Sequence, residues 1–427
     1  MNKKNLFLSL LLLLILSTNG CWDRRELESL GIVQALGLDL GPDQKGVTVT
    51  TMIAIPTQLG SGQPGGGGGG GGEDTGVLIV SMNAPSIYEA FNRINTTINR
   101  EITLLQNQVL LIGEELAKHG VEKWMDNLIR YREMRRTLLL FVCKGNAADI
   151  MKVQPKLERN PSEYFTDLVA MSRRTGMFPM VTLNDFLKNY EAFAHENYLP
   201  ILDKYKRKEG PEPATKGQGE QGGIQEEQAP PGEEQPPKKG EEEKPENVRF
   251  IGSAIFKKDR MVGNYDIYET QILLLLNNQF SEAMLTIEDP LKKGNHIIFR
   301  LLATTPAQIQ YRHQNKVDRF KVKFKLEADL VSIQSGIDYT RPKLEGFLGR
   351  MIAAELKNRL DKVIKKAQQE YNSDVFGFGE EVRKTFITSS DYEAYHWPDK
   401  FKAAEIQTQV KVAIRRVGVQ FHPPENR

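Results

Sequence analysis

The strictest pattern in this sequence is an alternation of apolar and charged side chains between Arg319 and Leu330. The apolar positions are Phe320, Val322, Phe324, Leu326, Ala328 and Leu330. The positions between them are all charged and are Arg319, Lys321, Lys323, Lys325, Glu327 and Asp329. Because successive side chains of a strand point to opposite faces, this alternation predicts a half-buried strand of an antiparallel sheet.

A long amphipathic helix is predicted after this strand, over residues 344–371. One face of this helix is rich in Lys and Arg, and the other is an apolar stripe that repeats at helical spacing. The stripe consists of Phe347, Leu348, Met351, Ile352, Leu356, Leu360, Val363, Ile364 and Ala367. Residues 406–414 alternate again and predict a last strand. Strands covered on one face by a long helix make an α+β domain, which we place at residues 291–420.

The N-terminal region alternates strand-like and helix-like segments. Strands are predicted at residues 47–55, 77–80, 109–112 and 137–143, and helices at residues 85–100, 114–132, 147–151 and 161–172. This order predicts an N-terminal α+β domain over residues 21–206, with Cys143 as a small apolar side chain in its core. Eight consecutive glycines, Gly65 to Gly72, fall between the first two strands, so we expect residues 60–76 to form a flexible loop.

A Pro-, Gly- and Glu-rich segment follows this domain. Residues 209–246 contain seven Pro, seven Gly, 11 Glu and four Lys, which gives a net charge of −7, and their one sizeable aliphatic residue is Ile224. Such a composition cannot bury enough apolar surface to offset the entropy of ordering. We therefore predict a disordered acidic linker at residues 207–247.

A smaller module is predicted between the linker and the C-terminal domain. Residues 250–256 are strand-like, and a second strand and a short helix at residues 266–276 can complete a middle domain over residues 248–290. The predicted fold class is therefore α+β, with three mixed α/β modules and one disordered linker.

The N-terminus begins like a secretion signal. Lys3 and Lys4 precede an apolar run of 11 residues, Leu6 to Leu16, which is shorter than the about 20 residues of a membrane-spanning helix. No later stretch of the sequence reaches 18 consecutive apolar residues. The chain is therefore expected to be exported and to have no spanning helix after the signal.

The residues after the apolar run have the layout of a bacterial lipoprotein signal. Small Gly20 directly precedes Cys21, so we predict a signal peptide over residues 1–20, cleavage after Gly20 and acylation of the Cys21 thiol. Thr18 and Asn19 depart from the commonest residues of such signals. The alternative is an ordinary cleaved signal followed by an incidental cysteine.

The sequence contains no motif of a common enzyme or metal site. H-E-x-x-H, C-x-x-C, G-x-S-x-G and P-loop patterns are absent, and no two of the six histidines are three or four positions apart. Two cysteines cannot build a Cys-rich zinc site. We predict no catalytic residue, no metal and no cofactor, while a catalytic set assembled from distant positions is the alternative.

The balance of charge gives no reason to expect a nucleic-acid partner. Lys plus Arg is 57 and Asp plus Glu is 55, but outside the signal and residues 209–246 the chain carries +7. Two basic clusters stand out, Arg130, Arg132, Arg135 and Arg136 in the first and Arg173 and Arg174 in the second. They are either solvated surface or contacts for anionic lipid head groups or an acidic partner.

Several segments together resemble the Ger(x)C lipoproteins, the C subunits of bacterial spore nutrient germinant receptors. The similar stretches are residues 21–27 (CWDRREL), 108–117 (QVLLIGEELA), 130–135 (RYREMR), 161–164 (PSEY), 252–257 (GSAIFK) and 374–379 (DVFGFG), with Trp397 downstream. They occur in the family's order from Cys21 to about Gly418. The glycine run and the acidic linker look like insertions in variable surface loops.

The resemblance implies a three-domain, largely α+β lipoprotein on the outer face of the spore inner membrane, anchored to membrane lipid through acylated Cys21. The implied partners are an integral A subunit and a transporter-like B subunit. The implied role is non-enzymatic sensing of nutrients that starts germination. A lipoprotein that itself captures the nutrient is the alternative, and it would need a cleft between two similar lobes.

Four aromatic residues are candidates for contacts outside the chain. Phe376 and Phe378 can share one face, and with Trp397 they are candidates for contact with a partner subunit, whereas packing into their own domain is the alternative. The glycines of residues 374–379 are expected to end the long helix and allow a tight turn. Trp22, next to the predicted lipid, is a candidate for the head-group interface, where the amphipathic indole ring is favoured.

Overall fold

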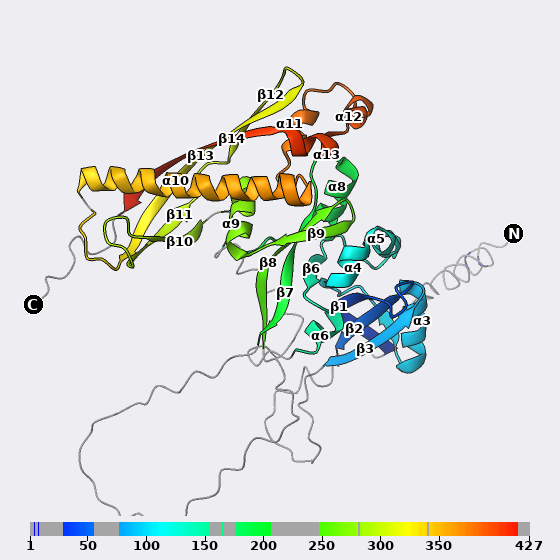
Figure 1. Cartoon of the computed structure of the whole chain (residues 1–427). Coiled ribbons are helices and arrows are strands. Elements are labelled where there is room, and N and C mark those ends of the chain that lie inside the picture. Colours follow the sequence, from blue (N-terminus) through cyan, green and yellow to red (C-terminus); the bar gives the residue numbers. More distant parts are fainter. Residues whose placement is uncertain are drawn as a thin grey trace, which may run out of the picture.

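The computed structural model describes residues 29–54, 77–153, 176–205, 247–280, 282–339 and 341–416, together with Lys4, Phe7 and Tyr164. The predicted signal peptide, including Gly20, lies outside the described residues apart from Lys4 and Phe7, as do Cys21 and Trp22. The predicted glycine loop, the acidic linker up to residue 246 and, apart from Tyr164, the predicted helix at residues 161–172 also lie outside them. The described part forms two domains, each built on its own sheet (Figure 1).

The N-terminal domain is built on a sheet with the strand order β3-β2-β1-β5-β6-β7-β8-β9, and β4 pairs with β1. The strands are β1 (Leu30–Leu40), β2 (Val47–Ala54), β3 (Val77–Ala84), β4 (Glu101–Thr103), β5 (Val109–Gly113), β6 (Leu139–Cys143), β7 (Tyr198–Tyr205), β8 (Asn247–Lys257) and β9 (Arg260–Tyr265). The central strands β1, β5, β6 and β7 run parallel, and β2, β3, β8 and β9 add antiparallel pairs at the two sides. The short central strands are apolar throughout because both faces of the sheet are covered.

Helices cover both faces of this sheet. One face packs against α6 (Ala147–Met151), in a core that includes Phe141 and Cys143. The opposite face packs against α3 (Ile87–Thr97), α4 (Glu114–His119), α5 (Glu122–Ile129) and α8 (Leu183–Ala192). The prediction that Cys143 is a core side chain is confirmed, because it is fully buried.

Both unusual segments of the sequence connect neighbouring antiparallel strands. Ala54 at the end of β2 pairs with Val77 at the start of β3, and Tyr205 at the end of β7 pairs with Asn247 at the start of β8. Each segment therefore leaves and rejoins the sheet at one hairpin end. Long insertions at such a place cost little stability because loop-closure entropy grows slowly with loop length.

The predicted middle domain is not a separate unit. β8 and β9 are the last strands of the N-terminal sheet, hydrogen-bonded in order to β7. The helix that follows, α9 (Ile267–Leu276), packs against β8 and also against the long helix of the C-terminal domain. The acidic segment therefore interrupts one sheet and does not separate two domains. Pairing of the strands on either side of it satisfies backbone N–H and C=O groups that would lack partners in a separate module.

The C-terminal domain is a smaller sheet centred on one long strand. Its strands are β10 (Glu282–Glu288), β11 (His296–Leu302), β12 (Gln308–Gln314), β13 (Val317–Ile333) and β14 (Glu405–Arg416). β11 and β12 pair antiparallel with the two halves of β13, and β14 pairs with β13 along most of its length. The predicted antiparallel sheet packed by a long helix is confirmed for β10, β11, β12 and β13. The β13–β14 pair is parallel, because the long helix crosses over between these two strands.

That helix is α10 (Pro342–Lys366), and it is continued by a short π-helical turn, η2 (Ala367–Tyr371). It lies across the strands (Figure 1), and its apolar stripe packs on the apolar face of β13, which confirms both the predicted strand alternation and the predicted helix. Three short helices precede β14, namely α11 (Phe378–Arg383), α12 (Ser389–Tyr395) and α13 (Trp397–Lys400), with a 3-10 turn η3 (Phe401–Ala403). No helix within the described ranges is long and apolar enough to cross a membrane.

Candidate functional site

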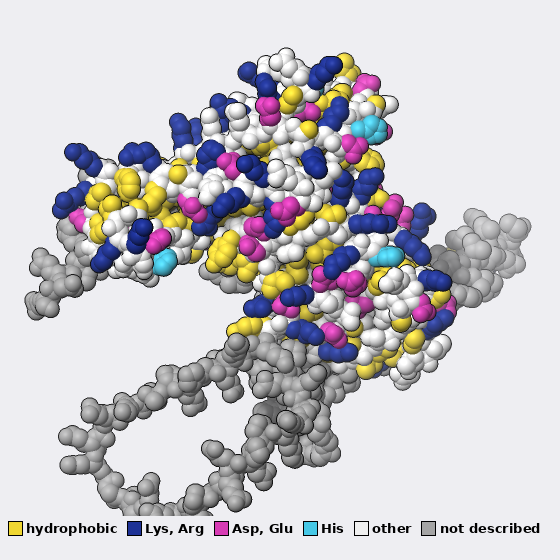
Figure 2. All heavy atoms as spheres, viewed as in Figure 1, with side chains coloured by type: hydrophobic (Ala, Val, Ile, Leu, Met, Phe, Trp, Pro, Cys, Tyr) yellow, Lys and Arg dark blue, Asp and Glu magenta, His cyan; other side chains and the backbone are white. Residues whose placement is uncertain are grey.

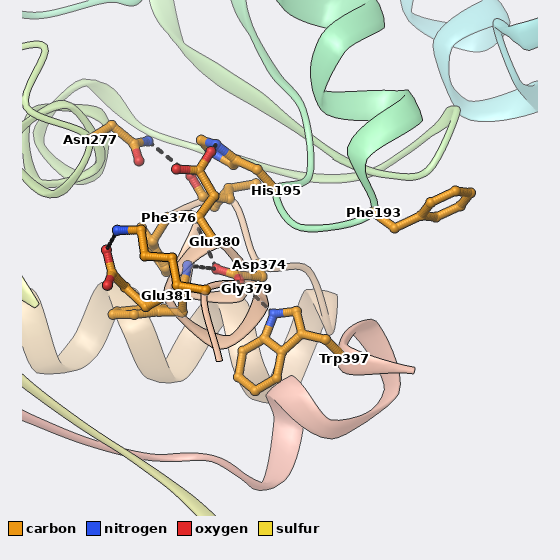
Figure 3. Close-up of polar contacts among 12 residues, drawn as sticks. Phe193, His195, Asn277, Asp374, Phe376, Gly379, Glu380, Glu381 and Trp397 are labelled. Carbon is orange, nitrogen blue, oxygen red and sulfur yellow. Dashed lines mark hydrogen bonds and ion pairs between the residues drawn. The ribbon is translucent and has the colours of Figure 1, made fainter. Parts of the chain in front are cut away.

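The segment Ser373–Gly379, here called the junction loop, lies where the two domains meet (Figure 3). It runs from the end of η2 into the first two residues of α11 and contains the DVFGFG stretch that the sequence analysis singled out. The chain turns sharply at Asn372, just before the loop, and at Gly377, just before α11, with φ of +46° and +72°. The long helix therefore ends at an asparagine, and the glycine that we expected to end it precedes the next helix instead.

Asp374 organises the junction loop by accepting hydrogen bonds while almost fully buried. Its carboxylate accepts from the indole Nε1–H of Trp397 at 2.8 Å and from the backbone N–H of Gly379 at 2.8 Å. Phe378 and Phe376 donate their backbone N–H groups at 3.2 and 3.3 Å. Burial raises the pKa of Asp374, and the Trp397 hydrogen bond and the nearby His195 offset only part of that rise.

The three aromatic residues predicted to contact a partner are buried inside the chain. Phe376, Phe378 and Trp397 are 3%, 0% and 1% exposed. The rings of Phe378 and Trp397 pack on Phe320 of β13, with ring centroids 5.0 and 5.5 Å apart. Their interpretation as exposed contacts is therefore wrong, and packing into their own domain, the alternative, is what the structure has. Burial of these three rings against the sheet stabilises the domain and leaves none of their own surface for a second chain.

The junction loop is also hydrogen-bonded to the N-terminal domain and to α9. Glu196, just before β7, donates its backbone N–H to the Asp374 carbonyl at 2.9 Å. The Val375 carbonyl accepts from Asn277 Nδ2 at 2.9 Å and from His195 Nε2 at 3.0 Å (Figure 3). Ser373 donates its hydroxyl to the Phe256 carbonyl of β8. These bonds fix the position of one sheet relative to the other.

The other ring nitrogen of His195 faces a carboxylate. His195 Nδ1 lies 3.8 Å from Glu380 Oε1, and the nearby imidazole holds the pKa of Glu380 below its usual range. Because Glu380 lies in the first turn of α11, this contact brings the N-terminal domain close to the short helices of the C-terminal domain. Neither His195 nor Asn277 was identified by the sequence analysis.

A second buried carboxylate lies at the tip of the β12–β13 hairpin. Asp318, which is 5% exposed, accepts hydrogen bonds from the hydroxyls of Tyr311 and Tyr395 at 2.8 and 2.7 Å. His313 Nδ1 lies 2.9 Å from the same carboxylate. Burial alone would raise the pKa of Asp318, but these three hydrogen-bond donors outweigh it and hold the pKa below its usual range. The cluster holds α12, which carries Tyr395, against the hairpin.

We expect this cluster to make stability depend on pH on the acid side. A carboxylate with a lowered folded pKa contributes stability above its unfolded pKa of about 3.9, and that contribution is lost as pH falls through the folded pKa. Asp318→Asn should lower the free energy of unfolding by about 1–3 kcal/mol at pH 7, and by less at pH 3. Urea denaturation at the two pH values measures the difference.

The exposed carboxylate of Asp399 provides the matched control for that comparison. Asp399→Asn removes one negative charge from the same region without removing an acceptor from the Asp318 cluster, so its effect should stay within about 0.5 kcal/mol at both pH values. Equal losses at pH 7 and pH 3 for Asp318→Asn would contradict the role assigned to the ionised carboxylate.

The basic cluster around residue 133 lies on the surface of the N-terminal domain. α5 ends at Ile129, and Arg130, Arg132, Arg135 and Arg136 after it are exposed, while Arg173 and Arg174 lie outside the described residues. Glu133, within the cluster, accepts hydrogen bonds from the Thr103 hydroxyl and the Leu104 N–H at 2.9 and 2.8 Å. Figure 2 shows Lys and Arg interspersed with Asp and Glu over this domain. A partner for these arginines stays a prediction.

The described residues include no group of three His, Cys, Asp or Glu side chains placed to hold a metal ion. A groove of about 490 Å³ lies between α10 and β14, lined by polar and charged residues such as Lys357, Asp361 and Gln368 and by apolar Ile364 and Ile406. A smaller apolar cavity of about 20 Å³ lies beside α9 and β10. The groove is formed by the C-terminal domain alone, and the cavity has room for only about one or two water molecules.

Two family models match the chain. Residues 23–204 match the spore germination protein N-terminal domain, and residues 251–418 match the model described as spore germination B3/GerAC like, C-terminal. The acidic segment falls in the gap between the two matches. The boundary between the two family models therefore lies between β7 and β8, which are paired strands of one sheet, and not between the two sheets of the structure.

Whole-chain relatives and one solved structure are similar to the chain. A Bacillus subtilis (strain 168) spore germination protein, YfkR, is 26% identical over 427 residues, which is 98% of each chain. Spore germination protein B3 of the same organism is 21% identical and covers 96% of this chain and 97% of its own. The crystal structure of the GerBC protein has a TM-score of 0.50 at 17% identity, covering 89% of this chain and 96% of that chain, so it shares the fold.

The matches begin two residues after Cys21 and end near the last strand, so they include both domains of the structure. They fall on the same stretches whose sequence resembled the family, among them the junction loop with its buried Asp374. The chain therefore belongs to the Ger(x)C family of spore germination proteins.

Proposed function

We propose that this chain is the lipid-anchored C subunit of a spore nutrient germinant receptor and acts by contact with integral membrane subunits, without catalysis. The observation that carries the proposal is the Gly20–Cys21 lipoprotein signal directly ahead of a family domain that begins at residue 23. Acyl chains on one cysteine, at about 0.8 kcal/mol per buried CH₂, anchor a protein stably when more than one is attached. Trp22 would then lie at the head-group interface on the outer face of the spore inner membrane.

The partners in this proposal are the integral A subunit and the transporter-like B subunit. Because Phe376, Phe378 and Trp397 are buried, these contacts would use other parts of the surface. The junction loop supports such a role indirectly. Its hydrogen bonds fix the two sheets relative to each other, so a contact on one domain would be transmitted to the other as a rigid-body displacement.

Direct capture of the nutrient by this chain is the second candidate, and the geometry gives it less support. A solute-binding protein closes two similar lobes around its ligand. Here the two sheets differ in strand number and topology, and the 490 Å³ groove lies on the C-terminal domain alone. Calorimetry of a Cys21→Ala chain with amino acids and sugars would separate the two candidates, since clear binding by this chain alone would favour capture.

Cys21→Ala tests the proposed anchor. The variant should leave the membrane fraction of spores and slow nutrient-triggered germination severalfold, because the acyl chains hold the chain beside its partners. Cys143→Ala is the matched control: it removes the buried thiol of β6, which cannot be acylated, and should stay in the membrane fraction. A Cys21→Ala chain that is fully soluble while germination is normal would contradict the proposal.

A further inference from the structure

One face of the C-terminal sheet carries a concentration of positive charge. In the half formed by β12, β13 and β14, α10 and the apolar side chains of β13 occupy one face. The opposite face presents Arg312, Lys321, Lys323, Lys325 and Lys411, here called the basic sheet face. Arg312, Lys325 and Lys411 are exposed, and the other two lysines are half-buried.

The cations of the basic sheet face have no partners among the residues that the structure describes. None of the five makes a hydrogen bond or an ion pair with its side chain anywhere in the described part of the chain. The carboxylates at the two ends of the face are already bound, Glu405 to Arg319 at 2.9 Å and Glu327 to Arg415 at 3.1 Å. The face therefore has an excess of positive charge that no other residue in the described ranges neutralises.

The strand register places like charges directly opposite each other. Lys325 pairs with Lys411 across the β13–β14 pair, and Arg312 pairs with Arg319 across the β12–β13 pair. Like charges at such positions destabilise a sheet. Because Glu405 already neutralises Arg319, the uncompensated pair is Lys325–Lys411, and a negatively charged ligand would remove the cost of that pair.

The other side chains of the face favour a hydrated surface over a protein partner. Lys321 has glutamines as cross-strand neighbours on both sides, Gln310 and Gln407, and Lys323 lies between Gln308 and Gln409 in the same way. Cores of protein interfaces are depleted in lysine and need buried aromatic or apolar anchors, which these residues do not supply. Lysines close to an anionic bilayer leaflet, in contrast, each contribute to binding while keeping their hydration.

We propose that the basic sheet face lies on the anionic head groups of the bilayer, so that the C-terminal domain contacts the membrane directly. The inference rests on the proposed membrane location of this chain. It also agrees with the distribution of charge in the sequence, since the modules outside the acidic segment carry +7. The contact would orient the domain on the membrane and remove the repulsion within the Lys325–Lys411 pair.

The test measures binding to lipid vesicles by residues 21–427 carrying Cys21→Ala. Without the Cys21 thiol this chain cannot be acylated. The described fold begins after this point, at Ser29. The chain should sediment with vesicles of phosphatidylglycerol and phosphatidylcholine but not with phosphatidylcholine alone, and binding should weaken as salt shortens the Debye length. Because no acyl chain takes part, this result is independent of whether Cys21 anchors the protein.

Two charge-matched variants locate the contact. Replacing Lys321, Lys323 and Lys325 by Gln should weaken binding about fivefold per lysine, roughly 100-fold in all. The control variant replaces three exposed lysines of α10, on the other side of the sheet, by Gln, namely Lys343, Lys362 and Lys365. Vesicle binding by this variant should weaken by less than about threefold. Equal losses in the two variants would assign binding to net charge and overturn the proposal.

Lys411→Gln separates loss of binding from loss of folding. The substitution removes one half of the repulsive Lys325–Lys411 pair, so its melting temperature should equal or exceed that of the unchanged sequence while vesicle binding falls about fivefold. No sedimentation with anionic vesicles would overturn the proposal. Binding of an acidic peptide with the sequence of residues 226–246, without vesicle binding, would also overturn it and assign the face to a protein segment.

Discussion

Asp374→Ala is expected to lower the free energy of unfolding by about 3–5 kcal/mol. The substitution leaves the indole N–H of Trp397 and the N–H groups of Gly379 and Phe378 without an acceptor in a site that water does not reach. Each buried donor left unpaired costs about 1–3 kcal/mol. Urea denaturation followed by tryptophan fluorescence measures the loss.

Two further variants test whether the acceptor itself is responsible. Asp374→Asn keeps one acceptor oxygen and should lose about half as much stability as the alanine variant. Asp43→Ala removes an exposed carboxylate from the turn between β1 and β2 and should change stability by less than about 0.5 kcal/mol. If Asp374→Ala unfolds at the same urea concentration as the unchanged sequence, the junction loop does not depend on this carboxylate.

Gly252→Ala is expected to lower the free energy of unfolding by at least about 3 kcal/mol, because backbone strain and steric overlap of the new methyl group add at this position. Gly252 has a φ of +145°, and a Cβ there would overlap the Tyr265 carbonyl oxygen of β9. It lies at an irregularity of the β7–β8 pair, where Gly252 is opposite Ile201 and Phe250 is opposite Leu202. An alanine would have to displace β9, the last strand of the N-terminal sheet. Thermal unfolding followed by circular dichroism measures the effect.

Gly336→Ala separates backbone strain from overlap. Its φ of +73° is also positive, but a Cβ at this position would meet nothing within 4 Å. The expected cost is therefore the strain alone, about 1–2 kcal/mol. Similar losses for Gly252→Ala and Gly336→Ala would mean that β8 and β9 adjust to the added methyl group, contrary to the close approach in the structure.

Much of the local structure could be predicted from periodicity. The alternation at residues 319–330 lies inside β13, the amphipathic stripe at 344–371 matches α10 and η2, and the strand predicted at 109–112 matches β5. These predictions succeed because side-chain spacing reports which face of an element is buried, whatever it packs against.

The candidate site could be predicted only in part. The DVFGFG stretch and Trp397 were correctly chosen as unusual, but whether their rings face a partner or the core depends on packing that no spacing reveals. His195 and Asn277 were missed because they are 180 and 98 residues from Val375, whose carbonyl both contact. Likewise, the unpaired charge of the basic sheet face became visible only when the registers of β12, β13 and β14 placed its lysines together.

The α+β class, the covered long strand, the predicted lipoprotein signal and the family resemblance follow from the order of neighbouring residues. Three further features needed the three-dimensional structure: β8 and β9 complete the N-terminal sheet, β14 runs parallel to β13, and Asp374 bonds both buried Trp397 and Glu196 of the other domain. These features depend on which distant backbone and side-chain groups satisfy each other's hydrogen bonds. Such pairings are selected by the free energy of the whole fold and not by local propensity.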